Sequence, residues 1–211
     1  MRFFFLLLII AFSHTFLHAQ QIRGGIIAGV SPSQVSGDRL SGFNKVGLTG
    51  GLLAKTAISP KMDVEVELLF VQKGSRKPID PDNNDYEEYK LELNYIEVPL
   101  IFQYHFNEKW IFDAGISYGR LIMSRESDEH GEFPETFPFK QNEFSINGGI
   151  NYYLFRNVLM NWRISNSVLP VRPHVSGAQF RLNRGQYNTV LMFLLKYEFG
   201  SRTRSENNGS N

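Results

Sequence analysis

The chain has 211 residues, of which 22 are basic and 21 acidic, so its formal net charge is only +1. That balance gives no reason to expect a nucleic-acid partner, which would select for a strongly basic surface. The sequence contains no cysteine, which excludes a disulfide framework and a lipid-acceptor cysteine behind a signal sequence.

The chain begins with MRFFFLLLIIAFSHTFLHAQQ, in which Arg2 precedes an apolar run and Ala19 precedes two glutamines. A basic residue, an apolar stretch and a small residue in this order are typical of a secretory signal peptide. The run is shorter than the roughly 20 residues that a membrane-spanning helix needs, which disfavours the alternative of an N-terminal membrane anchor. We therefore predict that residues 1–19 form a signal peptide.

Strict alternation of apolar and polar residues, the signature of a β-strand, recurs along the rest of the chain. The segment MDVEVELLF places five apolar residues on one face and Asp63, Glu65 and Glu67 on the other. No segment has a convincing helical period. We predict eight strands, at 22–30, 45–55, 62–70, 94–104, 110–119, 142–153, 157–165 and 187–199.

The links between these strands alternate in length, and this sorts them onto two ends. Short turns near 57–61, 105–109 and 154–156 fall at one end. The other end carries the long links, at 31–44, 72–90, 124–141 and 166–186. Outer-membrane barrels have short periplasmic turns and longer extracellular loops, so the alternation favours a transmembrane barrel over a soluble meander.

The two faces of the predicted strands differ sharply in charge. One face has 38 positions and no charge, while the other has 38 positions and eleven charges. An outward apolar face and an inward polar face are what a transmembrane barrel requires. The eleven inward charges are Arg23, Lys55, Asp63, Glu65, Glu67, Glu97, Asp113, Glu143, Arg163, Lys196 and Glu198.

Aromatic residues on the apolar face gather at the strand ends, where rings sit at the two membrane interfaces. Tyr118 and Tyr187 lie near the long loops, and the others lie near the short turns. The predicted interfacial aromatics are Tyr104, Trp110, Tyr118, Tyr152, Tyr197 and Phe199.

The strand LNYIEVPLIFQYHF (93–106) contains Glu97 and Pro99 among apolar residues. Glu97 falls on the charged face, so we expect it in a narrow lumen, where a buried carboxylate needs a partner. Pro99 lacks an N–H group, so it predicts a bulge or a broken ladder bond. The candidate partners of Glu97 are Arg163, Arg23, Lys55 and Lys196.

The same strand, with the glycine-rich start IRGGIIAGV and the closing LLKYEFG, resembles the PorT-like family of small outer-membrane barrels over roughly residues 20–200. The resemblance implies an eight-stranded barrel in the outer membrane. The branch that gives the family its name is linked to secretion and maturation of exported proteins, and most relatives have no assigned function. The resemblance supplies no catalytic residues.

Two short motifs partly match known catalytic or metal-binding patterns. GISYG (115–119) matches the G-x-S-x-G nucleophile pattern, but Ser117 lies in an alternating strand with no helix after it, so no enzyme activity is predicted. DPDNNDYEEY offers oxygens for calcium from Asp80, Asp82, Asn84 and Asp85, yet it lacks the glycine and the glutamate of an EF-hand, which favours a solvated acidic loop.

The histidines and the loop charges give weaker signals. His105 falls at a short turn, whereas His130 and His174 fall on long loops, so the three cannot share a metal site. Residues 124–141 carry five acids, and residues 166–186 carry Arg172, Arg181 and Arg184 without an acid. These arginines either pair with the neighbouring loop or form a recognition surface for a protein or for anionic headgroups.

The sequence therefore predicts an all-β, eight-stranded antiparallel up-and-down transmembrane barrel over residues 20–200, followed by a disordered polar tail at 201–211. We expect a monomeric barrel in outer-membrane lipid, without cofactor or metal, that acts as a structural or interaction module with a protein partner at its long loops. A lumen of eight strands is too narrow for a diffusion pore. The alternative is a soluble, lipocalin-like periplasmic barrel that turns its apolar face inward to bind a ligand.

Overall fold

The computed structural model describes residues 22–38, 40, 42–132, 137–173 and 185–200. The predicted signal peptide and the predicted tail at 201–211 lie outside them. The barrel strands are β1 (Arg23–Ser36), β2 (Lys45–Ser59), β3 (Met62–Lys77), β4 (Tyr89–His105), β5 (Trp110–Asp128), β7 (Asn142–Phe155), β8 (Val158–Ser167) and β9 (Tyr187–Glu198). A short strand β6 (Gly131–Glu132) and a 3-10 turn η2 (Pro81–Asn83) lie in the links.

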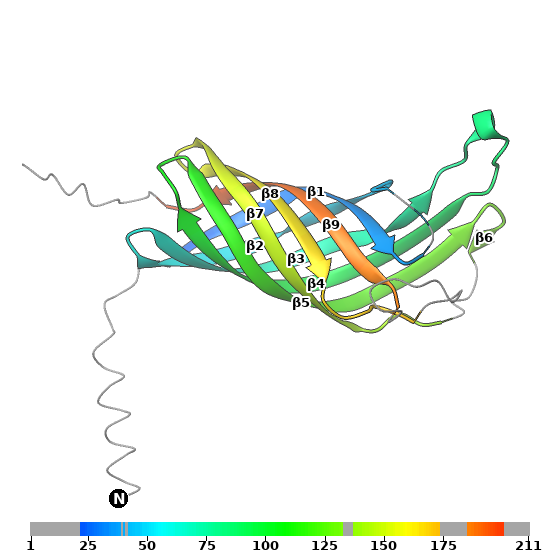
Figure 1. The fold of residues 1–211 in the computed structure, drawn as a ribbon. Coiled ribbons are helices and arrows are strands. Elements are labelled where there is room, and N and C mark those ends of the chain that lie inside the picture. The colour runs from blue at the N-terminus through cyan, green and yellow to red at the C-terminus, as the bar shows by residue number, and fades with distance from the viewer. Residues whose placement is uncertain (1–21, 39, 41, 133–136, 174–184, 201–211) are drawn as a thin grey trace, which may run out of the picture.

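Every barrel strand pairs antiparallel with its neighbours in the chain, and β1 pairs with β9, so the sheet closes on itself (Figure 1). The β6 strand only extends the hairpin of β5, through pairs at Ser127 and Asp128. The predicted closed meander of eight strands is confirmed.

One face of the strands is exposed and the other is buried, as the alternation predicts. Apolar side chains such as Leu48, Ile116 and Phe144 are at least half exposed on the outer wall, while lumen residues such as Glu65 and Arg163 are almost fully buried. The soluble, lipocalin-like alternative is wrong, because it needs the apolar face inside.

Four strands run at least five residues further than predicted at the end that carries the long links. β1 ends at Ser36, β3 ends at Lys77, β4 begins at Tyr89 and β5 ends at Asp128, so parts of the expected loops at 31–44, 72–90 and 124–141 are strand. Figure 1 shows the β3–β4 hairpin and the β5–β6 extension projecting beyond the rest of the barrel. These extensions lie beyond the apolar band, where no lipid imposes the apolar-polar alternation.

Pro99 interrupts a ladder without shifting its register. Between β3 and β4, pairs form at Val66–Leu100 and at Leu69–Glu97 but not at the two positions between them among the described pairs. The missing N–H of proline accounts for this gap. The predicted broken ladder bond at Pro99 is therefore confirmed. The alternative, a bulge, does not lie there, since the register shift of β4 against β5 is at Asn94–Tyr95.

Candidate functional site

The lumen near the short turns holds a first cluster of ion pairs. Arg23 contacts Asp63 at 3.0 Å and Glu198 at 3.3 Å, while His105 Nε2 lies 3.0 Å from Asp63. Lys55, which lies on β2, forms an ion pair with Glu198 on β9. These contacts join the first, second, third, fourth and last strands across the interior.

The second cluster fills the middle of the barrel, and its central interaction is a bidentate ion pair. Arg163 on β8 donates from Nη1 and Nη2 to the two carboxylate oxygens of Glu67 on β3, at 2.6 and 2.8 Å. Lys196 donates to Glu65 at 2.5 Å and to Glu67 at 2.7 Å. Asp113 lies 3.6 Å from Arg163. Four elements on opposite walls are thereby tied together by groups that water does not reach.

The third cluster contains Glu97, and its partner is a residue that the sequence did not suggest. Lys73 contacts Glu97 and donates to Glu143 at 2.8 Å. Glu143 also accepts from Asn188 at 2.6 Å and from Ser145 at 2.8 Å. The prediction that Glu97 pairs with Arg163, Arg23, Lys55 or Lys196 is wrong, since among the described residues this carboxylate forms its ion pair with Lys73.

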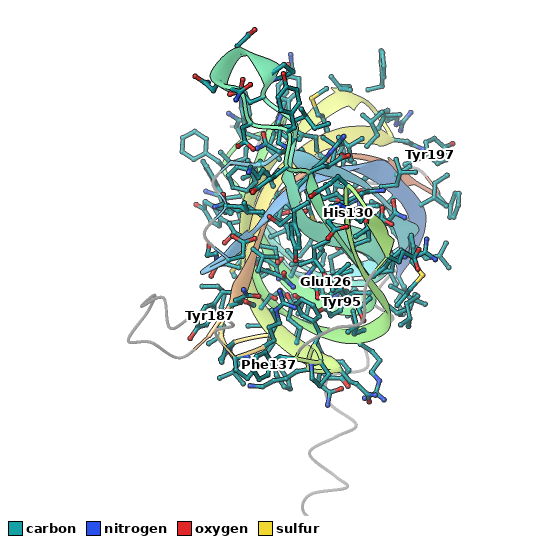
Figure 2. All side chains as sticks on the ribbon, turned by 90° about the vertical axis from the view of Figure 1, so that its right-hand side faces the viewer. Tyr95, Glu126, His130, Phe137, Tyr187 and Tyr197 are labelled. Carbon is teal, nitrogen blue, oxygen red and sulfur yellow. The ribbon has the colours of Figure 1, made fainter. Side chains whose placement is uncertain are left out.

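Above the third cluster, residues from two long links close the lumen. Phe139 and Val171 are buried against Val35, Leu91 and Tyr95. The backbone N–H of Lys140 donates to the carbonyl of Val171 at 2.7 Å, which joins the two links. In Figure 2, which looks into this end, Tyr95 and Glu126 lie inside the ring of strands, whereas Tyr197 lies on its outer wall. We call Phe139, Val171 and Arg172 the outer plug.

Comparison with known families fits this architecture. A family model described as "Outer membrane protein beta-barrel domain" matches residues 18–171. The chain belongs to this family. Its polar, ion-paired lumen and its apolar outer wall are those of an outer-membrane barrel, and the protein resides in the outer membrane. No curated protein matches the chain.

Solved structures share the fold of this outer-membrane barrel at low sequence identity. Neisserial surface protein A is 12% identical, with 83% of this chain and 97% of that chain covered and a TM-score of 0.52. Ail, the attachment invasion locus protein of Yersinia pestis, is 14% identical, with 84% and 98% covered and a TM-score of 0.50. Within the described residues, no helix is long and apolar enough to cross a membrane.

Arg172 belongs to the plug of the barrel and not to its surface. Its Nη1 lies 2.7 Å from Glu126, its Nε donates to Gln186 at 2.6 Å, and its guanidinium stacks 4.2 Å from the ring centre of Phe139. A recognition role for this side chain is wrong, because it is only 4% exposed. For Arg172, the other interpretation holds: the side chain pairs with Glu126, a residue of the neighbouring predicted loop. The structure does not describe Arg181, Arg184 and His174, nor Glu135, which is one of the five acids of residues 124–141.

Tyr89 on β4 also contacts Glu126, the carboxylate that pairs with Arg172. Its hydroxyl donates to Glu126 at 2.6 Å. Burial and the hydrogen bond to Glu126 raise the pKa of Tyr89, so it remains a neutral donor at physiological pH.

The candidate calcium ligands of the acidic loop do not converge. Lys77 holds the Asp85 carboxylate at 2.9 Å, and Asn83 donates to Asp80 at 2.8 Å within the turn. Hydrogen bonds to Asp85 and Glu87 raise the pKa of Lys77, and the bond from Lys77 lowers the pKa of Asp85. Among the described residues, Asp80, Asp82 and Asp85 form no convergent set of carboxylates, so a calcium site with Asn84 is not supported.

One convergent set of possible ligands does occur in the described part of the chain, at Asp128, Glu129 and His130. Glu129 and His130 are exposed and Asp128 is half-buried at the tip of the β5–β6 hairpin, and His130 Nδ1 lies 3.3 Å from Glu129. Exposed acidic groups of this kind are common without a metal.

The predicted interfacial aromatics line the outer wall. Near the short turns, the tilted rings of Trp110 and Tyr152 have their centres 4.7 Å apart, and those of Tyr197 and Phe199 have theirs 5.8 Å apart. Tyr118 lies against Phe144 toward the other end. Tyr104 is also exposed, but Tyr187 is only 3% exposed, so its expected place on the open apolar face is wrong.

Ser117 of the GISYG motif lies in the middle of β5, with its hydroxyl turned away from the outer wall. Asn147 donates to its Oγ at 3.1 Å. A nucleophile needs a sharp turn that exposes the hydroxyl, whereas this serine is 5% exposed in a regular strand.

Proposed function

We propose that this chain is a monomeric interaction module of the outer membrane, accessory to protein secretion, that acts through its long-loop end and does not conduct solutes. The observation that carries the proposal is the occupied lumen. Three ion-pair clusters and the outer plug fill the interior from Arg23 to Arg172. A barrel of this size has room for side chains only.

The projecting extension supplies the proposed contact surface. It comprises the β3–β4 hairpin and the end of β5, and its outer face carries charged residues that pair locally, such as Arg76 with Glu88 at 2.9 Å and Arg125 with Glu132 at 2.8 Å. Exposed pairs contribute little stability, so they can exchange partners at low cost. The secretion role rests on the resemblance of the strand around Glu97 to the PorT-like family.

A conductance measurement tests the closed lumen. Purified protein inserted into planar bilayers is expected to give no steady current, because the buried Arg163–Glu67 pair blocks the path. Insertion is checked independently, by a mobility shift on unboiled gels. A steady current from folded protein would contradict a closed module and favour a channel.

The secretion role is tested by comparing the exported proteins of cells with and without this chain. We expect specific exported proteins to be lost without it and restored by the full chain. A variant with residues 78–88 replaced by a short turn, which removes only the tip of the hairpin, is expected to insert normally but not to restore them. An unchanged set of exported proteins would refute the secretion role, and full rescue by the trimmed variant would place the contact elsewhere.

A further inference from the structure

The lipid-facing wall carries an apolar groove of about 420 Å³ near the extracellular end. Ligand pockets commonly fall in the range of roughly 300–1,000 Å³. The side chains that form it come from β4, β5, β7 and the link after β8, and include Val98, Leu100, Ile116, Phe144, Ile146 and Leu169.

The link after β8 makes this stretch of wall concave. The backbone N–H of Val168 donates to the carbonyl of Phe144 at 2.8 Å, which fixes the link along β7. Val168 and Leu169 are each about half exposed and line the groove, although they lie beyond the end of the strand. Apolar residues on a link therefore face the same side as the lipid-facing strands.

A cation stands next to the groove on the same face of β5. Ile116, Tyr118 and Arg120 follow one another at a period of two, so all three project outward. Arg120 Nη1 and the Tyr118 hydroxyl both donate to the Asn142 side-chain oxygen at 2.9 Å. Most of the guanidinium donors are left for another acceptor.

Arg120 differs from the other exposed arginines of this end. Arg76 and Arg125 each pair with a carboxylate, whereas the recorded partner of Arg120 within the described residues is the neutral Asn142. Its neighbours across the ladders, Ile96 and Asn142, carry no charge either. An anion would find an uncompensated positive charge here.

The position of Arg120 along β5 matches the outer membrane interface. It lies ten residues beyond Trp110, the interfacial aromatic at the short-turn end. Ten residues at about 3.3 Å each, tilted by roughly 40°, rise about 25 Å, which is the height of the apolar band of such barrels. The guanidinium therefore lies at headgroup level, and the groove lies at the level of the acyl chains.

We propose that this surface is a binding site for an anionic lipid of the outer leaflet, with its phosphate on Arg120 and an acyl chain in the groove. Arginine matches phosphate geometry with two parallel hydrogen bonds, and these strengthen where water is scarce. Asn142, which also accepts from the Tyr118 hydroxyl, holds the guanidinium in place, and Val168 and Leu169 keep the acyl chain beside the barrel.

The test uses folded protein in detergent micelles, with bisphosphorylated lipid A as the probe and native mass spectrometry as the readout. Wild-type protein is expected to retain one lipid. Arg120→Gln is expected to weaken retention about tenfold, as loss of a charge-assisted hydrogen bond would. Ile146→Trp, which fills the groove from the lipid side, is expected to weaken it as well. The matched controls are Arg125→Gln, another exposed arginine, and Leu48→Trp on the distant β2; both should bind like wild type.

Several outcomes would overturn the site. Equal retention by Arg120→Gln and wild type would remove the headgroup contact, and an equal loss in Arg125→Gln would indicate a general charge effect. Retention by Ile146→Trp as strong as that of Leu48→Trp would remove the acyl chain from the groove. Displacement of the lipid by inorganic phosphate would assign Arg120 to a free anion. All variants are first checked for a boiling-dependent mobility shift, and Ile116→Trp replaces Ile146→Trp if the latter does not fold.

Discussion

Replacement of Arg163 by methionine is expected to lower the free energy of unfolding by about 3–5 kcal/mol, the usual cost of removing one partner of a buried ion pair. Arg163 and Glu67 both have fully buried side chains and share two hydrogen bonds. The substitution leaves the charge of Glu67 in the lumen with only Lys196 to oppose it. The measurement is a urea titration of the protein in lipid vesicles, followed by tryptophan fluorescence and by the mobility shift on unboiled gels.

Two further variants separate loss of the pair from loss of packing. Adding Glu67→Gln to Arg163→Met removes the uncompensated charge, so the double variant is expected to be more stable than the single one. Arg76→Met breaks a pair that is 47% and 33% exposed, and is expected to cost less than about 1 kcal/mol. A single variant no less stable than Arg76→Met, or a double variant no better than the single, would contradict a structural role for the pair.

The sequence was sufficient to predict the fold and the sidedness of the strands because the bilayer enforces both. The outer wall cannot carry charges at the centre of the lipid layer. The alternation of outward apolar residues with inward residues along the strands therefore has almost no exceptions. The eleven charged residues, from Arg23 to Glu198, accordingly point into the lumen. The strand extensions were missed because QKGSRK (72–77) lies beyond lipid and is polar on both faces.

The pairing of the lumen charges could not be predicted in the same way. Lys73 falls in the predicted loop 72–90, so the alternation of the strands does not place it in the lumen beside Glu97. Its second partner, Glu143, is 70 residues away in sequence. Such contacts depend on how far the register staggers around the barrel, which sets which residues face each other across the lumen. The plug was missed for a related reason, since Phe139 and Arg172 come from links that carry no periodic signal.

Replacement of Gly115 by alanine is expected to destabilise the barrel by about 1–3 kcal/mol, the usual range for overpacking. A Cβ atom at this position would lie 2.2 Å from the carbonyl oxygen of Leu100 and 2.9 Å from the Cα of Ile101. Both are backbone atoms of β4, so neither can move aside without displacing the strand. Gly115→Val adds more bulk at the same point and is expected to prevent closure between β4 and β5.

Gly148 offers the matched control, since it pairs with Ala114, the neighbour of Gly115 in the chain. A Cβ atom there meets no atom within 4 Å. Gly148→Ala is therefore expected to leave stability within about 0.5 kcal/mol of wild type, or to raise it slightly, because alanine loses less chain entropy than glycine on folding. The readouts are the folded fraction after refolding into vesicles and the urea midpoint. If the two alanine variants behave alike, close approach of β4 and β5 at Gly115 does not limit closure, and the curvature of this small barrel must have another source.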